Sequence, residues 1–154
     1  MTLRLNPFAA APAPMKSWLE FGQSLNRCGL EESLMELVKT RASQINGCAF
    51  CLDMHTADAR KRGESEQRLY LLDAWRDSPR FYSERERAAL AWTEALTLVS
   101  ERRAPDDVYR LLQAQFTEEE QVTLTLLIVV INGWNRLNVG FGVEPRLAEQ
   151  RAAG

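Results

Sequence analysis

Apolar residues recur at helical spacing along most of the chain. The early segments, over residues 15–26 and 30–45, carry them at Met15, Trp18, Leu19, Leu25, Leu30, Leu34, Leu37, Val38, Ala42 and Ile45. Repeats of three and four residues are typical of amphipathic helices with one buried face. Gly29 separates the two segments, and Asn46 and Gly47 end the second, because both residues tolerate the left-handed conformation that closes a helix.

The next two helices are marked chiefly by their ends. One is expected from near Cys48 to about Arg62, where Gly63 stops it, and a short one from about Glu64 to Trp75. The sequence DSPRFY then breaks the pattern, because a proline cannot continue a helix.

Three later helices have start signals of their own. Ser83 with Glu86, and Thr117 with Glu120, have the spacing of a capping box, in which each side chain accepts the other residue's backbone N–H. Pro105 suits the first turn of a helix between them. No alternation of strand period bounded by turns is present. The predicted fold class is therefore all-α, a helical bundle in a single domain.

The most apolar run is VTLTLLIVVI, Val122–Ile131. It has about half of the roughly 20 residues that a membrane-spanning helix needs, so we expect a buried helix. Its β-branched residues leave a strand as the alternative, although the capped helical context argues against it. Because the run is apolar on nearly every side, we expect a second subunit to cover one face and hence a homo-oligomer. The alternative is a central helix in a compact bundle.

The N-terminal stretch MTLRLNPFAAAPAPMKSW is rich in alanine and proline. Its three prolines fall within eight residues, and it lacks the continuous apolar core of a secretion signal. We interpret residues 1–14 as an extended arm that lies across a neighbouring surface, and residues 15–154 as the helical domain. Without an export signal we expect a cytoplasmic protein, whose cysteines stay reduced unless they have redox work or hold a metal.

Composition narrows the classes of partner. The 154 residues are 45% hydrophobic and 26% charged, an ordinary globular mixture that is long enough for a sizeable core. The net charge of −2 and the pI of about 5.5 leave no basic surplus to neutralise a phosphate backbone. We therefore expect no nucleic acid as partner, and the shortness of the apolar run Val122–Ile131 leads us to expect no membrane.

The stretch INGCAFCLDMHTADARKRG, residues 45–63, holds two of the three cysteines and the only histidine. On a helix that turns about 100° per residue, Cys48, Cys51 and His55 share one face. Cysteines three residues apart have Cα atoms about 5 Å apart, within range of a disulfide that opens and closes without unfolding. The pattern indicates a redox-active dithiol beside a proton carrier.

The start of this helix adds an electrostatic effect. Unpaired N–H groups favour thiolate, the form that attacks peroxides and disulfides, and Cys48 is nearer to them than Cys51. His55 can accept or pass a proton near neutral pH. Glu36, on the preceding helix, is placed to face His55 and fix its tautomer. The alternative is that Glu36 is a solvated acid, like Glu31.

Other interpretations of these residues remain open. Two cysteines, a histidine and a glutamate can bind zinc, although structural zinc sites usually have a second ligand pair. Covalent haem attachment needs a histidine directly after the second cysteine, where this chain has Leu52. A thioredoxin-like site needs a strand before its C-x-x-C. The plainest alternative is two small core residues and a hydrogen-bonded histidine, and we adopt the core interpretation for the lone Cys28.

The spacing of Glu36, Cys48, Cys51 and His55, with the following ERERAALAWTEALT, resembles the alkylhydroperoxidase D-like branch of the carboxymuconolactone decarboxylase family. The resemblance extends over residues 34–100. It implies an all-α oligomer and a thiol peroxidase that reduces hydroperoxides with no cofactor and no metal. By position, Cys51 resembles the peroxidatic cysteine and Cys48 the resolving one. Glu36 and His55 resemble the proton-relay pair.

The same resemblance implies a hydroperoxide substrate, an antioxidant role and a thiol or dithiol reductant, such as a thioredoxin-like or lipoyl protein. The alternative is a redox-sensing or disulfide-exchange module with a protein target. Some family members carry a second histidine between the cysteines, where this chain has Phe50. The decarboxylase branch lacks the cysteine pair, so lactone decarboxylation is not expected. Candidates for an apolar pocket are Phe50, Trp92 and the late helix, although Trp92 and Trp134 are more typical of a core.

Overall fold

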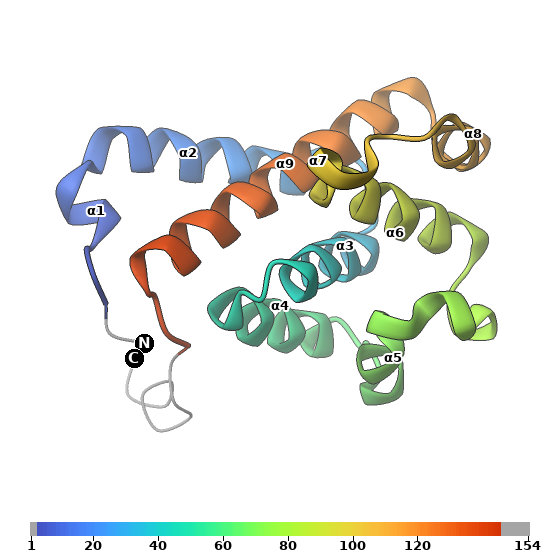
Figure 1. The fold of residues 1–154 in the computed structure, drawn as a ribbon, viewed down its shortest axis with the longest axis horizontal. Coiled ribbons are helices and arrows are strands. Elements are labelled where there is room, and N and C mark those ends of the chain that lie inside the picture. The colour runs from blue at the N-terminus through green and yellow to red at the C-terminus, as the bar shows by residue number, and fades with distance from the viewer. Residues whose placement is uncertain (1–2, 146–154) are drawn as a thin grey trace.

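The computed structural model describes residues 3–145, and within that range the chain is helical without strands (Figure 1). Its α-helices are α1 (Pro7–Ala10), α2 (Pro12–Ser24), α3 (Glu32–Ile45), α4 (Ala49–Lys61), α5 (Glu66–Leu71), α6 (Glu84–Thr97), α7 (Val99–Arg102), α8 (Asp106–Gln115) and α9 (Glu118–Phe141). Short 3₁₀ segments are η1 (Leu25–Arg27), η2 (Leu72–Asp77) and η3 (Pro79–Phe81). The prediction of an all-α fold is confirmed.

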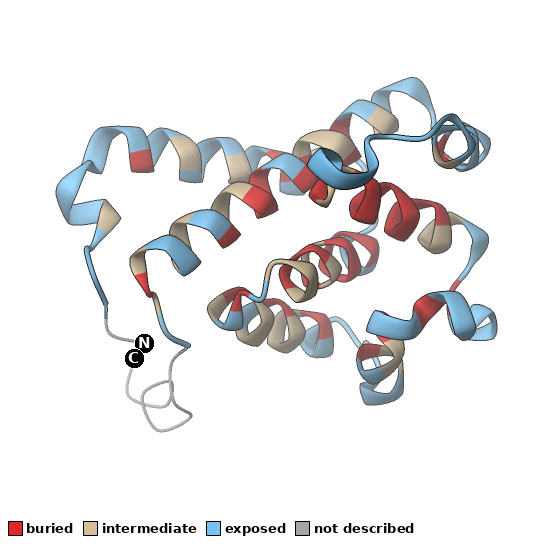
Figure 2. Cartoon of the chain, in the orientation of Figure 1, coloured by how far each residue is buried: buried red, intermediate tan, exposed pale blue. Residues whose placement is uncertain are grey.

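Helix α3 lies at the centre of the bundle. It packs against α4, α6 and α9, and its Leu37 and Val38 are completely buried. Figure 2 shows buried residues gathered on α3, α6 and the middle of α9, whereas α2 and α8 are mostly exposed. Each buried leucine contributes roughly 1.5–3 kcal/mol relative to an exposed one, so this junction holds α3 firmly beside α4.

The long helix α9 contains the most apolar run. The Thr117–Glu120 capping box forms at its start, and Val122–Ile131 is helical, so the strand alternative is wrong. By length and composition α9 could cross a membrane, but half of its most apolar window is buried inside the structure, as in the core helix of a bundle. Its outer face stays open, because Val122 is 60% and Val129 is 51% exposed. A second subunit over this face remains a prediction.

The N-terminal segment differs from the predicted extended arm. Pro7–Ala10 is helical, and α2 begins at Pro12. The prolines start these helices, because a first-turn residue needs no hydrogen bond for its N–H. Asn6 caps α1 through its side-chain oxygen, which accepts two backbone N–H groups. The prediction of an extended backbone for residues 1–14 is therefore wrong over residues 7–10 and 12–14. Residues 1–2 lie outside the described range.

The same segment packs on its own chain. The backbone N–H of Arg4 donates to the carbonyl of Phe141 at 2.8 Å, and the Arg4 guanidinium donates to the carbonyl of Gly140 at 3.2 Å. These bonds fix the N-terminal residues beside the end of α9. The predicted boundary between an arm and a domain over residues 15–154 stays a prediction.

Of two further helix starts, one follows its sequence signal and the other begins one residue later than predicted. Ser83 Oγ accepts the backbone N–H of Glu86, and the Glu86 carboxylate accepts that of Ser83, which confirms the capping box. Pro105 is the N-cap of α8 and not a first-turn residue. Asp106 and Asp107 occupy that first turn, where negative charge is favoured by the helix dipole.

The helix expected from Glu64 to Trp75 is not continuous. Helix α5 ends at Leu71, and the 3₁₀ segment that follows has Ala74 in a non-helical conformation. Trp75 is turned inward there, and its indole N–H donates to the buried Glu94 carboxylate at 2.8 Å. Packing against α6 therefore ends the helix before the sequence pattern does.

Candidate functional site

The hairpin between α3 and α4 places both cysteines. Helix α3 ends at Asn46, and Gly47 adopts a φ of 64°, a left-handed conformation that glycine reaches at little steric cost. Cys48 is then the N-cap of α4, and its Sγ accepts the backbone N–H of Cys51 at 3.4 Å. Cys48 thus takes the position that serine or aspartate usually holds, just before the helix.

The two sulfur atoms face each other. The Sγ atoms of Cys48 and Cys51 are 2.6 Å apart, and both residues are free thiols. The cysteines are 1% and 0% exposed and pack with Ala42 and Ile131. A disulfide needs a sulfur separation of about 2.05 Å, so a small rotation can close the pair.

A shared hydrogen bond makes the two thiols unequal. The hydrogen bond with Cys51 lowers the pKa of Cys48 to about 7, helped by the Cys51 backbone N–H and by Asn135 and Asn138, against the desolvation of burial. The hydrogen bond with Cys48, together with burial, raises the pKa of Cys51. In the resting dithiol the first negative charge therefore lies on Cys48, in line with the expectation from the helix start.

Glu36 and His55 form the second pair. His55 Nδ1 lies 2.9 Å from Glu36 Oε2, and the two residues are 7% and 4% exposed. The alternative of a solvated Glu36 is therefore wrong. Burial alone would raise the pKa of Glu36, but hydrogen bonds from His55 and from Lys39, at 3.1 Å, outweigh it and hold the pKa below its usual value. The carboxylate is thus charged and accepts the Nδ1–H of His55, which leaves Nε2 free to act.

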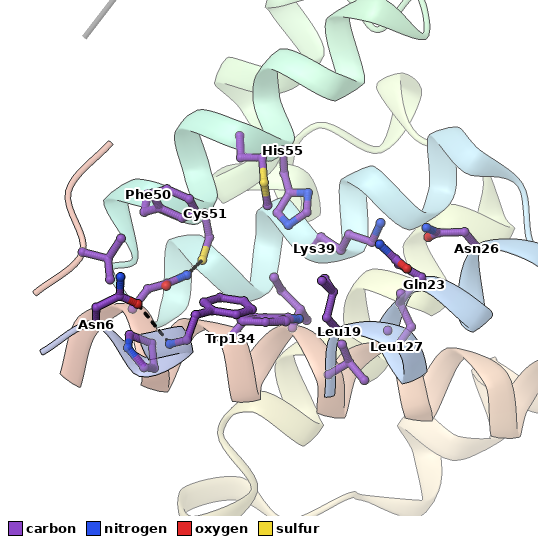
Figure 3. Close-up of a pocket in the computed structure, with 18 of the residues that line it drawn as sticks. Asn6, Leu19, Gln23, Asn26, Lys39, Phe50, Cys51, His55, Leu127 and Trp134 are labelled. Atoms are coloured by element: carbon purple, nitrogen blue, oxygen red, sulfur yellow. Dashed lines mark hydrogen bonds between the residues drawn. The ribbon is translucent and has the colours of Figure 1, made fainter. Parts of the chain in front are cut away.

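A cavity of about 560 Å³ lies beside Cys51. The N-terminal segment, α2, α4 and α9 form its walls, which are mostly apolar and include Phe8, Leu19, Phe50, Met54, Ile131 and Trp134. Figure 3 shows the Cys51 sulfur pointing into this space near Trp134, with His55 and Lys39 further along. Cys48 is not part of the wall. A small apolar molecule in the cavity would therefore meet Cys51 first.

The predicted pocket residues are partly right. Phe50 and several residues of α9 line the cavity, as expected. Trp92 does not line it, because this residue is buried in the main core and its indole N–H donates to Thr125 Oγ1 at 2.9 Å. Trp134, which is more typical of a core by its sequence context, lines the cavity instead.

The four predicted site residues therefore form two pairs, and one member of each pair lines the cavity. Cys51 and His55 are one turn apart on α4 and both line it. Among the described residues, no hydrogen bond joins His55 to either sulfur. Cys51 and His55 thus lie side by side along one wall of the cavity, where a bound molecule can touch both.

One contact to the Cys51 sulfur was not predicted. Asn138 Nδ2 donates to Cys51 Sγ at 3.2 Å, and Asn138 also lines the cavity. The available signal is the repetition of Asn132, Asn135 and Asn138 at three-residue spacing along an apolar helix. Asparagine is a poor helix former, so its repetition there indicates a specific task.

A possible metal site is smaller than the zinc site considered from the sequence. In the part of the chain that the structure describes, ligand atoms of Glu36, His55 and Asp58 lie within 4.8 Å of one another, without either thiol of the C-x-x-C pair. Lys39 pairs with Glu36 at 3.1 Å and Lys61 with Asp58 at 3.0 Å. These ammonium groups compete with a cation, and the arrangement does not assemble two cysteines, a histidine and a glutamate around one point.

Comparisons with protein families and known proteins identify relatives of this chain. A profile of the Carboxymuconolactone decarboxylase family matches residues 12–95. The uncharacterized protein YdfG of Bacillus subtilis (strain 168) is 43% identical over 142 residues, which are 92% of this chain and 96% of YdfG.

Solved structures share the fold. The crystal structure of ATU0492 from Agrobacterium tumefaciens, a protein of unknown function proposed to be an antioxidant defence protein AhpD, has a TM-score of 0.91 at 43% identity and covers 95% of this chain and 99% of that one. The debrominase Bmp8 has a TM-score of 0.81 at 20% identity and covers 94% and 77% of the two chains, which shows a common fold alone.

The family profile covers more than half of the chain, and YdfG and ATU0492 match it over nearly its whole length. The all-helical fold and the motif on α3 and α4 agree with the resemblance found in the sequence. The chain therefore belongs to the carboxymuconolactone decarboxylase family, as one of its alkylhydroperoxidase D-like members.

Proposed function

We propose that this protein is a thiol-dependent alkylhydroperoxidase that reduces organic hydroperoxides by a Cys48/Cys51 dithiol–disulfide cycle, in antioxidant defence in the cytoplasm. The observation that carries the proposal is the position of the Cys51 sulfur in the wall of an apolar cavity, with a second thiol 2.6 Å away. Family membership and the likeness to ATU0492 support the antioxidant role.

The oxidative half of the cycle takes place at Cys51. Its thiolate attacks the terminal oxygen of the hydroperoxide, so that an S–O bond forms while the O–O bond breaks. The sulfur is oxidised by two electrons to sulfenic acid, and the peroxide is reduced to an alkoxide. The alkoxide takes up a proton and leaves as the alcohol.

The reductive half uses the second thiol. Cys48 attacks the sulfenic sulfur of Cys51, an S–S bond forms, and the hydroxyl group leaves as water. An external dithiol then reduces the disulfide and is itself oxidised. Because Cys48 and Cys51 are 1% and 0% exposed, a reductant must reach them through the cavity. A slender lipoyl arm meets this condition better than the surface of a thioredoxin-like protein.

The Glu36–His55 pair supplies the proton. With Nδ1–H held by the Glu36 carboxylate at 2.9 Å, Nε2 of His55 is the ring atom that can take a proton from the thiol and give it to the leaving oxygen. Because His55 lines the same cavity as Cys51, a bound hydroperoxide can lie within reach of both.

The lining of the cavity supports an organic substrate. Phe8, Phe50 and Trp134 present aromatic surface, and burial of apolar area stabilises a bound organic group by about 25 cal/mol per Å². Hydrogen peroxide gains nothing from such surface. Phe50, at the position where some family members carry a second histidine, makes this part of the cavity more apolar.

The alternative function, a redox-sensing or disulfide-exchange module, needs the thiol of a target protein to reach the sulfurs. Because the dithiol is buried and is approached through the cavity, a small substrate is favoured over such a target. Turnover separates the two functions, because a sensor is oxidised by peroxide but is not recycled rapidly by a small dithiol.

The first test is mass spectrometry of the reduced protein before and after one equivalent of cumene hydroperoxide. We expect the loss of two hydrogens, mapped to a Cys48–Cys51 disulfide, and steady turnover when dihydrolipoamide is added. Oxidation without turnover would support the sensing module. An unoxidised protein, or bound zinc in the native spectrum, would contradict the peroxidase.

Cysteine variants test which sulfur attacks the peroxide and which one resolves the sulfenic acid. Cys51→Ser should abolish turnover, whereas Cys48→Ser should leave a sulfenic acid at Cys51 that dimedone traps. Cys28→Ser is the matched control, because Cys28 does not line the cavity and its thiol donates to the carbonyl of Leu25. Full activity in Cys51→Ser would move the nucleophile to Cys48.

A further inference from the structure

Three asparagines of α9 form a polar row that faces the α3–α4 hairpin. Asn46 Nδ2 donates to Oδ1 of Asn132 at 3.0 Å and to Oδ1 of Asn135 at 2.9 Å. Asn135 Nδ2 donates to Ser43 Oγ at 3.0 Å. Asn138 continues the row by one more turn. The row ties α9 to the hairpin and sets the register of α9 against the two cysteines.

Asn138 differs from Asn132 and Asn135 in its place beside the cavity. Its Nδ2 donates to Cys51 Sγ at 3.2 Å, and its side chain lines the cavity. A hydrogen bond donated to sulfur stabilises thiolate more than thiol. The contact therefore favours negative charge on Cys51, at the place where a substrate would be bound.

Attack by Cys51 on a peroxide requires a hydrogen-bond donor that stabilises the Cys51 thiolate. In the resting pair the pKa of Cys48 is lowered and that of Cys51 is raised, yet Cys51 and not Cys48 lines the cavity. For Cys51 to attack, its proton must pass to Cys48 across the 2.6 Å between the sulfurs, or to another base. His55 and Lys39 are the other titratable groups of the cavity wall. Once the charge is on Cys51, it needs a local donor.

Resting on the peroxidase function, we propose that Asn138 is a catalytic residue: its amide N–H stabilises the negative charge on Cys51 Sγ, the sulfur that lines the cavity, as the peroxide is attacked. The S–O bond forms at Cys51 as the O–O bond breaks, and the alkoxide leaves with a proton. Asn138 transfers no proton. It lowers the energy of the ionised sulfur before attack.

The test measures the ionisation of the Cys51 thiol in the Cys48→Ser background, where the second thiol of the pair is absent. Iodoacetamide alkylation is followed against pH and mapped to Cys51 by mass spectrometry. Asn138→Leu should raise the midpoint pH by about one unit, because a lost hydrogen bond to a charged group makes ionisation harder by about tenfold. Asn138→Asp, which keeps the side-chain shape, should raise it further, because a carboxylate repels the thiolate. In the otherwise native dithiol, both variants should slow oxidation by cumene hydroperoxide at least tenfold.

The control is Val139→Asp, which adds the same charge one residue along α9 at a half-exposed position outside the cavity wall. We expect its alkylation midpoint and oxidation rate to match those of the parent. Circular dichroism shows whether Asn138→Leu is folded, and if it is not, the isosteric Asn138→Asp gives the answer. An unchanged midpoint in the folded variants would overturn the role of Asn138, and so would unchanged oxidation rates. A shifted midpoint in a protein that no peroxide oxidises would instead refute the peroxidase function.

Discussion

At the scale of single residues, the charge on Glu36 determines which ring nitrogen of His55 carries a proton and which is available to accept one. Buried between Lys39 and His55, the carboxylate stays ionised and fixes one imidazole tautomer. A neutral amide at this position can still accept the Nδ1–H of His55, but it cannot stabilise a protonated ring. The role of Glu36 is therefore electrostatic as well as geometric.

Glu36→Gln should slow turnover by roughly 10²-fold, the lower end of the range for general acid–base catalysis. The helices should be retained by circular dichroism, since the hydrogen-bond geometry survives. Steady-state kinetics with cumene hydroperoxide and a dithiol give the measurement. Glu32→Gln, an exposed acid in the first turn of the same helix, is the matched control and should keep full activity. A Glu36→Gln protein as fast as its Glu32 counterpart would remove Glu36 from the relay.

The same variant has an effect on stability that depends on pH. Because the folded-state pKa of Glu36 lies below its ordinary value of 4.5, the ionised carboxylate stabilises the fold above that pH. This contribution is lost as the pH falls through the lower folded-state pKa. Urea unfolding should therefore show the largest difference between wild type and Glu36→Gln above pH 4.5, and a shrinking one in more acidic buffer.

How far single residues can be predicted depends on how local their contacts are. Cys48, Cys51 and His55 are carried by one helix start, and the short turn at Gly47 brings Glu36 alongside, so their spacing predicts their proximity. Asn138 is 87 positions from Cys51, and their contact depends on how α9 packs on α4. Spacing alone cannot predict such a contact.

At the scale of elements, close packing of α2 on α9 determines one wall of the cavity. Trp18 of α2 lies directly over Gly133, where a Cβ atom would come within 2.5 Å of the indole ring. The indole ring of Trp18 also packs at a tilt against that of Trp134, with 6.3 Å between the ring centroids. Gly133 therefore allows the two helices to approach, and Trp134 is held between α2 and the cavity.

Gly133→Ala should destabilise the protein by about 1–2 kcal/mol, because overpacking costs about 1–3 kcal/mol and the better helix propensity of alanine returns up to about 1 kcal/mol. Urea denaturation gives the measurement. Gly140→Ala is the matched control on the same helix, since nothing lies within 4 Å of its added Cβ, and it should be neutral or slightly stabilising. Equal stability of the two variants would show that α2 moves aside freely.

Elements were predictable where their signals are local. The two capping boxes at Ser83 and Thr117 form as the sequence predicts, because each involves residues three apart. The early prolines predicted an extended arm, yet they begin helices, since proline suits both an extended segment and a first turn. The outcome there depends on the Asn6 cap and on packing against α9.

At the scale of the whole molecule, the cavity is built from both ends of the described chain. Leu3, Phe8 and Val143 contribute to its wall, and the Arg4–Phe141 backbone bond brings these ends together. Phe8 stacks on Trp134 with ring centroids 6.2 Å apart. One wall of the cavity therefore depends on the N-terminal segment lying against α9, which no local pattern in the sequence could indicate.

The opposite side of α9 leads to the prediction of an oligomer. Val122 and Val129 are 60% and 51% exposed, and seven residues at about 100° each bring them to the same side of the helix. Exposed β-branched side chains in such a row are typical of a surface that another subunit covers.

Val129→Lys should therefore weaken self-association by at least about 10²-fold, because a buried unpaired charge costs several kcal/mol. Size-exclusion chromatography with light scattering gives the mass of each species. Val99→Lys is the matched control, since Val99 is 53% exposed on the short helix α7. A wild-type mass of 17.5 kDa at micromolar concentration, or a Val129→Lys oligomer as stable as the wild type, would leave the apolar side of α9 to another partner.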